Sequence, residues 1–300
     1  MRILITGATG FIGSHLVKQL LTDNHTIFCT LLKEEINPFG EDNVKSIVFS
    51  DHSFDENVDF LKGNNIEGII HLASFVQSGE HKSSDIEALI DTNIKFSAML
   101  LETSAQAQVK WFINTGTYWQ NYNNQDYSPV NLYAATKEAF MDIAKYYIET
   151  NQIQFVTIKL FDTYGSNDSR PKIFNLWERI AKSGEMLEMS PGEQLIDISY
   201  IDDIVSAFTL LATHLHNNNP EVPNGAVYAV KAEKRYTLKE LAFIYEEATC
   251  TKLNINWGAR GYREREVMIP WTDGVIVPDW KPRISIEVGI RNQIQIKLDS

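Results

Sequence analysis

The sequence is poor in cysteine, in basic residues and in long apolar runs. Its 300 residues include two cysteines, Cys29 and Cys250, which are too few for a disulfide framework or a metal cluster. There are 27 basic side chains against 39 acidic ones, a net charge of -12, which disfavours nucleic acid and, less strongly, anionic membranes as partners. The longest apolar stretch, residues 204–212, is too short to cross a bilayer, and no secretory signal precedes the first apolar run. We therefore expect a cytoplasmic protein without a membrane or nucleic-acid partner.

Short apolar runs alternate with helical patterns through the first half of the chain. The predicted strands are residues 2–5, 26–32, 46–49, 68–72, 111–114 and 154–160. The predicted helices are residues 86–106 and 132–150 and, in the less regular second half, residues 170–184, 201–214 and 238–249. This alternation predicts an α/β protein whose parallel sheet is covered on both faces.

A glycine loop lies between the first predicted strand and the helix that follows it. Residues 3–13 read ILITGATGFIG. Gly7 permits a tight turn, Gly10 a close approach of the backbone to a ligand, and Gly13 close packing of helix on strand. The start of the helix offers unpaired N–H groups and the positive end of its dipole to an anion. We predict a dinucleotide pyrophosphate site made by Gly7, Thr9, Gly10, Phe11, Ile12 and Gly13.

Tyr133 and Lys137 are the strongest catalytic candidates. Their spacing of four residues in NLYAATKEAF puts both side chains on one face of a helix. A tyrosine with its ordinary pKa of about 10 is a poor acid-base catalyst unless a nearby cation favours the phenolate. Lys137 is predicted to lower that pKa and to donate to the ribose hydroxyls of a cofactor. Thr115, at the end of the predicted strand 111–114, is predicted to hydrogen-bond a substrate carbonyl.

Six motifs follow one another along the chain: GATGFIG, HLAS (71–74), NTGT (114–117), Tyr133-x-x-x-Lys137, LFDTYG (160–165) and DISYIDDIV (197–205). In this order they resemble the extended short-chain dehydrogenase/reductase family, whose members epimerise, dehydrate or reduce nucleotide sugars. The later stretches PGEQLIDISYIDDIVSAF and WGARGYREREVM most resemble the reductases that make 3,6-dideoxy sugars, such as CDP-abequose and CDP-paratose synthases.

The resemblance implies a Rossmann-type doubly wound parallel sheet that binds NAD(P), with a smaller α+β C-terminal domain that binds a nucleotide-diphosphate sugar. The first domain comprises residues 1–165 and a return segment near 197–230. The second comprises residues 166–196 and 231–300. A homodimer built from the helices at 86–106 and 132–150 is also implied.

Departures from the family pattern narrow the activity. Dehydratases carry an Asp-Glu pair directly after the catalytic threonine, where this chain has Gly116 and Thr117. Epimerase-reductases of fucose nucleotides use a Cys and a His, and neither cysteine here accompanies the Thr–Tyr–Lys set. With these two activities disfavoured, the predicted activity is reduction of the C4 ketone of a nucleotide-linked 4-keto-6-deoxyhexose. The alternative is an NAD-dependent nucleotide-sugar 4-epimerase. A non-catalytic NAD(P)-sensing regulator, the alternative of another class, is disfavoured because Thr115, Tyr133 and Lys137 are all present.

The second predicted strand bears on the cofactor. Leu31 stands about where NAD-specific relatives have an acid for the ribose 2′-OH, and Lys33 suits a 2′-phosphate. These residues favour NADPH, with NADH as the alternative, although Glu34 and Glu35 would weaken the effect of Lys33. Asp51 stands where the family contacts the adenine amine.

The resemblance assigns further residues to each ligand. Along the cofactor it places Leu72, Ala73, Ser74 and Tyr164. For the sugar nucleotide it indicates Thr117 and, as ligands of the phosphates, Arg263 and then Arg265. Asp162 stands where relatives often have asparagine.

Overall fold

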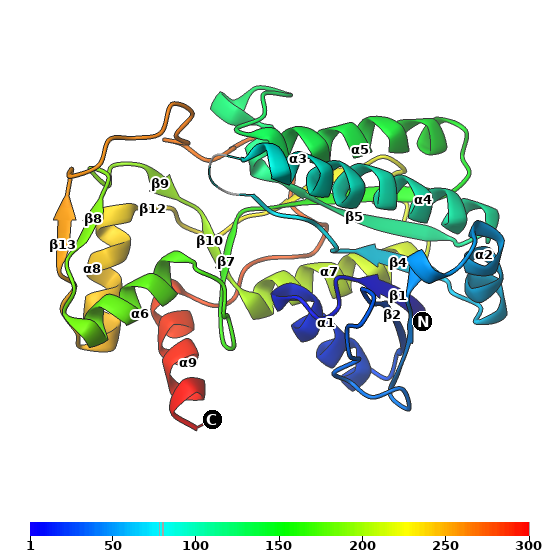
Figure 1. Ribbon diagram of the computed structural model, residues 1–300, viewed down its shortest axis with the longest axis horizontal. Helices are drawn as coiled ribbons and strands as arrows, with labels where there is room; N and C mark the ends of the chain where they lie inside the picture. The colour runs from blue at the N-terminus through cyan, green and yellow to red at the C-terminus, as the bar shows by residue number, and fades with distance from the viewer. Residues whose placement is uncertain (78, 80, 300) are drawn as a thin grey trace.

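A seven-stranded parallel sheet forms the centre of the larger region (Figure 1). The computed structural model describes residues 1–77, 79 and 81–299, without the side chains of Asp51 and of residues 295–299. The strand order is β11-β6-β5-β4-β1-β2-β3, and each neighbouring pair is parallel. The strands are β1 (Arg2–Thr6), β2 (Thr26–Thr30), β3 (Val44–Ile47), β4 (Gly68–His71), β5 (Trp111–Thr117), β6 (Gln154–Leu160) and β11 (Val227–Val230). This order confirms the predicted doubly wound α/β fold.

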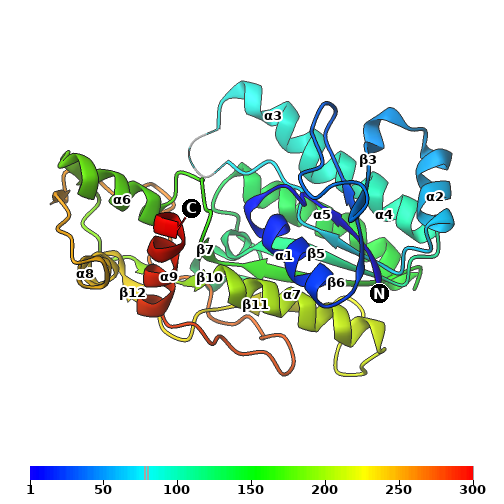
Figure 2. The ribbon, with the colours of Figure 1, turned by 90° about the horizontal axis from the view of Figure 1, so that it is seen from below.

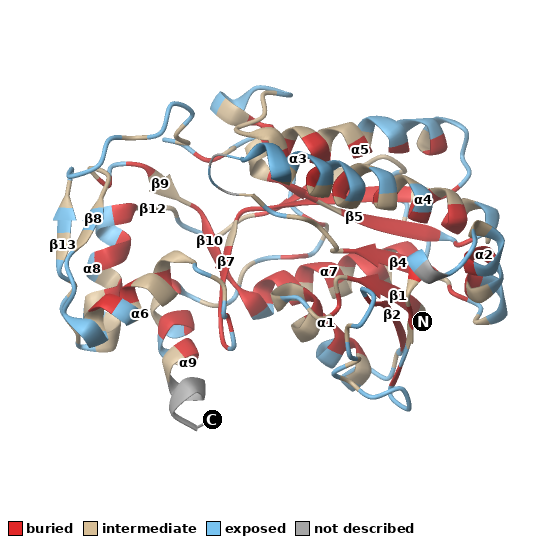
Figure 3. Ribbon diagram, in the orientation of Figure 1, coloured by how far each residue is buried: buried red, intermediate tan, exposed pale blue. Residues whose placement is uncertain are grey.

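Helices cover both faces of this sheet, each over its own apolar core (Figure 2). On one face lie α1 (Phe11–Thr22) and α7 (Ile201–His216). On the other lie α2 (Phe54–Gly63), α4 (Ser97–Gln106) and α5 (Leu132–Glu149), with α3 (Ser83–Ile90) preceding α4. The strands are buried on both sides (Figure 3), which explains why they read as near-continuous apolar runs.

The helix predicted at 86–106 is divided by a π-helical segment, η2 (Asp91–Phe96), between α3 and α4. A π-helix inserts an extra residue into the turn and often occurs at functional sites. The short 3₁₀ helices are η1 (Phe49–Asp51), η3 (Tyr118–Gln120) and η4 (Tyr122–Asn124). No helix in the described ranges is long and apolar enough to cross a membrane.

A smaller region, here called the second region, lies beside the sheet and comes from residues 166–196 and from most of 231–299 (Figure 1). Within the later segment, Val275 and Trp280 pack on the larger region instead: Val275 pairs with Tyr228 of β11, and Nε1 of Trp280 donates to Oγ of Ser206 in α7 at 2.9 Å. Its helices are α6 (Ile173–Ser183), α8 (Leu238–Thr249) and α9 (Ile286–Asp299). Two strand pairs join its two segments: β8 (Leu187–Met189) with β13 (Ile255–Trp257), and β9 (Leu195–Ile196) with β12 (Tyr236–Thr237). At the junction with the sheet, β7 (Asp162–Tyr164) pairs with β10 (Ile198–Tyr200). The chain between these segments supplies α7 and β11 to the larger region.

Candidate active site

The glycine loop is packed too tightly for side chains. Gly7 has a φ of +66°, and a Cβ there would lie 2.8 Å from the backbone nitrogen of Ala73. A Cβ on Gly13 would overlap the carbonyl oxygen of Gly7. Helix α1 begins after Gly10 with no side-chain cap among the described residues, so its first N–H groups are available to an anion. These features fit the pyrophosphate of a dinucleotide.

Tyr133 and Lys137 both lie on the buried face of α5, as their spacing predicts. Only 9% of Tyr133 and 2% of Lys137 is exposed. The Tyr133 ring packs edge-on against Trp119, with centroids 6.4 Å apart, and Ser74 is near enough to its hydroxyl to affect its pKa. Because Ser74 follows β4 and Trp119 follows β5, the tyrosine lies at the carboxyl ends of two neighbouring strands, where doubly wound sheets bind ligands.

Burial controls the ionisation of this pair. Burial raises the pKa of Tyr133 to about 12, and the nearby Ser74 hydroxyl offsets only part of that rise. It also lowers the pKa of Lys137 to about 8. Desolvation therefore sets the net direction of the shift at Tyr133, and the predicted lowering of its pKa by Lys137 stays a prediction. A tyrosine with this pKa keeps its proton at neutral pH and is available as a proton donor.

Thr115 has a hydroxyl without a partner. Its Oγ1 is buried in β5 and makes no hydrogen bond to any residue that the structure describes. The neighbouring Thr117 instead accepts a hydrogen bond from the backbone nitrogen of Trp119 at 3.3 Å, which starts η3. A Cβ on Gly116 would lie 2.7 Å from Oε1 of Gln120, so the Gln120 side chain would have to move to admit the acid that a dehydratase carries there.

Asn93, which the sequence analysis missed, joins the loop after β4 to α5. Its Oδ1 accepts hydrogen bonds from the Ser74 hydroxyl at 3.0 Å and the Phe75 nitrogen at 2.9 Å. Its Nδ2 donates to the Phe75 carbonyl and to Oγ1 of Thr136, both at 3.0 Å. Asn93 lies in the π-helical segment η2, which an apolar periodicity does not distinguish from an α-helix. Ser74, which lies near the Tyr133 hydroxyl, is thereby held in place.

An acidic side chain, that of Glu35, lies between the glycine loop and the end of β2, a position that the sequence did not predict. Leu31 is buried at the end of the strand, whereas Lys33 is exposed. The carboxylate of Glu35 returns to the loop and accepts a hydrogen bond from the Thr9 hydroxyl at 2.5 Å. The side chain of Asp51 lies outside the described residues, so its predicted contact with adenine stays a prediction.

A pocket of about 180 Å³ lies where β7 meets the second region. It is lined by Asp162 and Lys172, whose charged atoms are 3.7 Å apart. Nearby, the guanidinium of Arg170 lies over the ring of Phe11 at 4.2 Å, and Asp168 holds it at 2.8 Å. Arg170 therefore connects the second region to the glycine loop, a role that the sequence motifs did not indicate.

The two predicted phosphate ligands, Arg263 and Arg265, are exposed on the segment after β13. Nη2 of Arg265 donates to Oγ of Ser128 at 2.7 Å, and its guanidinium lies over the ring of Tyr122 at 4.3 Å. Neither arginine lines the pocket of Asp162 and Lys172. Their contact with substrate stays a prediction.

Tyr164 is buried at the junction and also lines the pocket of Asp162 and Lys172. Its ring packs edge-on against Phe174 and Tyr200, at centroid distances of 4.8 and 5.4 Å. Its hydroxyl donates to the carbonyl of Ile286 at 3.3 Å, at the start of α9. These contacts support a structural role, and the predicted contact with the cofactor has no support in them.

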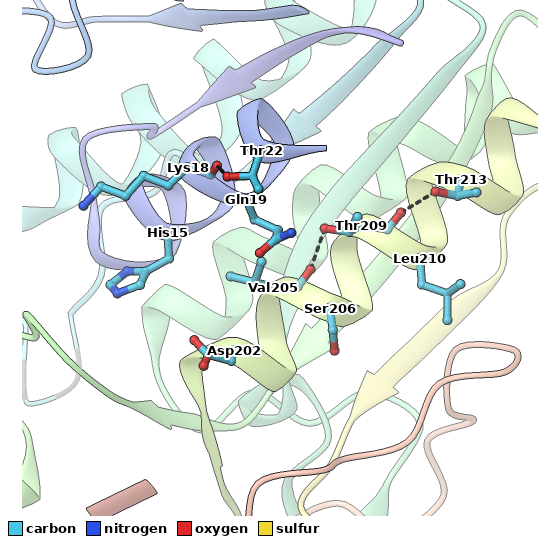
Figure 4. Close-up of a pocket in the computed structure, with 10 residues that line it drawn as sticks. All are labelled: His15, Lys18, Gln19, Thr22, Asp202, Val205, Ser206, Thr209, Leu210 and Thr213. Atoms are coloured by element: carbon cyan, nitrogen blue, oxygen red, sulfur yellow. Dashed lines mark hydrogen bonds between the residues drawn. The ribbon is translucent and has the colours of Figure 1, made fainter. Parts of the chain in front are cut away.

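A further cavity, of about 570 Å³, lies between α1 and α7 (Figure 4). Its lining residues are His15, Lys18, Gln19, Thr22, Asp202, Val205, Ser206, Thr209, Leu210 and Thr213. None belongs to the predicted catalytic set, and α5 covers the opposite face of the sheet. This groove is therefore separate from the candidate active site.

Comparisons with known proteins agree with this arrangement. Residues 3–226 match the family model described as the NAD dependent epimerase/dehydratase family. CDP-abequose synthase of Salmonella muenchen is 26% identical over 99% of this chain and 98% of its own. CDP-abequose synthase of Yersinia pseudotuberculosis is 28% identical over 90% of this chain and 92% of its own. The structure of UDP-glucuronic acid 4-epimerase from Bacillus cereus in complex with UDP-glucuronic acid and NAD is similar in fold, with a TM-score of 0.82, 20% identity and full coverage of both chains. The chain therefore belongs to the NAD-dependent epimerase/dehydratase family.

Proposed function

We propose that this protein reduces the C4 ketone of a nucleotide-linked 4-keto-6-deoxyhexose. The observation that carries the proposal is the burial of Tyr133 and Lys137 on one face of α5, at the carboxyl ends of β4 and β5. Similarity to CDP-abequose synthases over almost the whole chain supports a deoxysugar substrate. Gly116 and Thr117, in place of the Asp-Glu pair of dehydratases, argue against a dehydratase.

Each residue of the set has a separate part in this reaction. A reduced nicotinamide dinucleotide held at the glycine loop and by Lys137 would supply a hydride for sugar C4. Tyr133 gives its hydroxyl proton to the C4 oxygen, which becomes the alcohol, and Thr115 donates a hydrogen bond to the same oxygen as negative charge develops on it. Lys137 binds ribose hydroxyls through its ammonium group. The choice of NADPH stays a prediction, because it depends only on Leu31 and Lys33.

The test is a panel of CDP-, dTDP-, GDP- and UDP-linked 4-keto-6-deoxysugars, followed by nicotinamide absorbance and by NMR of the product. We expect stoichiometric oxidation of added NADH or NADPH and a new alcohol at C4. A 4-epimerase would instead interconvert two sugars with no net oxidation of cofactor. That result would contradict the proposal and favour the epimerase.

Thr115→Val is expected to lower kcat without lowering the stability of the folded protein. Valine has the shape of threonine but donates no hydrogen bond, so we expect kcat to fall about 10- to 100-fold, the equivalent of a hydrogen bond to a charged group. The melting temperature should stay the same or rise, because the buried Oγ1 of Thr115 has no partner to lose. The matched control is Thr157→Val in β6, which removes the acceptor of Nδ2 of Asn114 and should lower the melting temperature. Unchanged kcat in Thr115→Val would rule out its contact with the C4 oxygen.

We also propose that the protein is a homodimer that associates through α3, α4 and α5. Large apolar side chains are exposed on these helices: Ile86, Ile90, Met99, Ile143 and Tyr146. Their gathering on neighbouring helices is typical of an interaction surface. The helices are those for which the family resemblance implies dimerisation.

Tyr146→Glu is expected to weaken the dimer at least about tenfold, because it places an unpaired charge in an apolar interface. Size-exclusion chromatography with light scattering, over a series of protein concentrations, measures the effect. Phe243→Glu is the matched control, since Phe243 on α8 has the same exposed fraction as Tyr146, 61%. A wild-type protein that is monomeric at all concentrations, or an equal response of the two variants, would contradict the proposed interface.

A further inference from the structure

The carboxylate of Glu35 is fixed between the glycine loop and the end of β2. Its Oε1 accepts a hydrogen bond from the Thr9 hydroxyl at 2.5 Å, and its Oε2 accepts one from the backbone nitrogen of Leu32 at 2.8 Å. Thr9 lies between Gly7 and Gly10, and Leu32 is the second residue beyond β2. Two anchored oxygens make this a positioned group rather than a solvated surface charge.

A turn from Leu32 to Glu35 brings the carboxylate to this position. The backbone nitrogen of Glu35 donates to the Leu32 carbonyl at 3.0 Å, and Glu34 between them has a φ of +69°. A left-handed conformation is unfavourable for a non-glycine residue, so the contacts of Glu35 help to hold the turn. Beside the carboxylate, the side chains of Leu32 and Ile36 are 76% and 85% exposed. These apolar side chains suit the flat face of an adenine.

We infer that Glu35 makes this protein select NAD(H) over NADP(H). In a doubly wound fold the adenosine ribose lies beside the glycine loop and the end of β2, where an acid accepts hydrogen bonds from the 2′-OH. Glu35 supplies that acid from beyond the strand, whereas sequence position alone directs attention to Leu31. The negative charge of Glu35 would repel the 2′-phosphate of NADP(H). Lys33 in the same turn is exposed, and the neighbouring acid Glu34 offsets its positive charge. This inference reverses the prediction of NADPH, and it rests on the proposed function only in requiring that the site bind a nicotinamide dinucleotide.

The test measures binding without any sugar. Dissociation constants of NADH and NADPH are obtained from nicotinamide fluorescence at two salt concentrations, for the wild type, Glu35→Gln and Glu34→Gln. We expect the wild type to bind NADH about tenfold or more tightly than NADPH, the equivalent of a single charge-assisted hydrogen bond. In Glu35→Gln, NADPH binding should tighten about tenfold while NADH binding weakens a few-fold.

Glu34→Gln is the matched control, because it removes the same charge one residue away and should change the NADH-to-NADPH ratio less than about twofold. Added salt should lower the wild-type ratio, because it screens the repulsion between carboxylate and phosphate. Tighter binding of NADPH by the wild type, or equal shifts in the two variants, would overturn the role of Glu35. Failure of both dinucleotides to bind would instead contradict the proposed function itself.

Discussion

Tyr133→Phe is expected to lower kcat by at least about two orders of magnitude, the usual contribution of a positioned acid. The substitution removes the proton donor but keeps the ring that packs against Trp119. The dissociation constant of the cofactor should therefore change little. Stopped-flow or steady-state absorbance of the nicotinamide gives kcat, and fluorescence titration gives the binding constant.

Tyr146→Phe is the control for this experiment, since Tyr146 lies on the same helix with its side chain 61% exposed. We expect wild-type kcat from that variant. If Tyr133→Phe also turned over at a near-normal rate, the proton would have to come from another group and the catalytic assignment of Tyr133 would be wrong.

Lys137→Met should have the second large effect: it is expected to lower the activity and to raise the stability of the folded protein. Loss of the ammonium removes a donor to the ribose hydroxyls, so we expect a raised KM for the cofactor together with a lowered kcat. The melting temperature at pH 7 should rise, because burial lowers the pKa of Lys137 to about 8 and the folded state therefore disfavours its charge. Kinetics and a thermal melt of the same preparation measure both effects. Lys145→Met is the control, because Lys145 lies on the exposed face of α5 in a pair with Glu149.

The pH profile provides an independent check on Lys137. Its charged form prevails below its pKa, so wild-type activity should decline as the pH rises through about 8, while Tyr133, with a pKa of about 12, remains protonated. In Lys137→Met the decline near pH 8 should disappear. A decline that persists unchanged in the variant would assign it to another group.

Local sequence patterns predicted the glycine loop and the helix that carries Tyr133 and Lys137. The apolar run before Gly7 predicted β1, and the glycine spacing predicted the tight packing that leaves no room for side chains. A separation of four residues predicted that Tyr133 and Lys137 share one face of a helix. Each of these inferences depends on geometry within one or two turns of the chain, which sequence alone determines well.

The contacts that the sequence did not predict depend on distant segments or on unusual backbone. Glu35 reaches Thr9 only because Glu34 adopts a positive φ, and residue type gives no sign of that turn. Arg170 packs on Phe11, although the two residues are far apart in the sequence. The ionisation of Tyr133 depended on how deeply the tertiary structure buries it, and the spacing to Lys137 carries no information about that depth.

The pairing of strands in the second region has a consequence for protein engineering. β8 and β9 come from the earlier segment, and β12 and β13, which complete their ladders, come from the later one. Neither segment forms these ladders alone, and an incomplete strand edge attracts other chains. A chimera with a relative must therefore exchange both segments together. A chain truncated after β11 would keep β8 and β9 without the strands that pair with them.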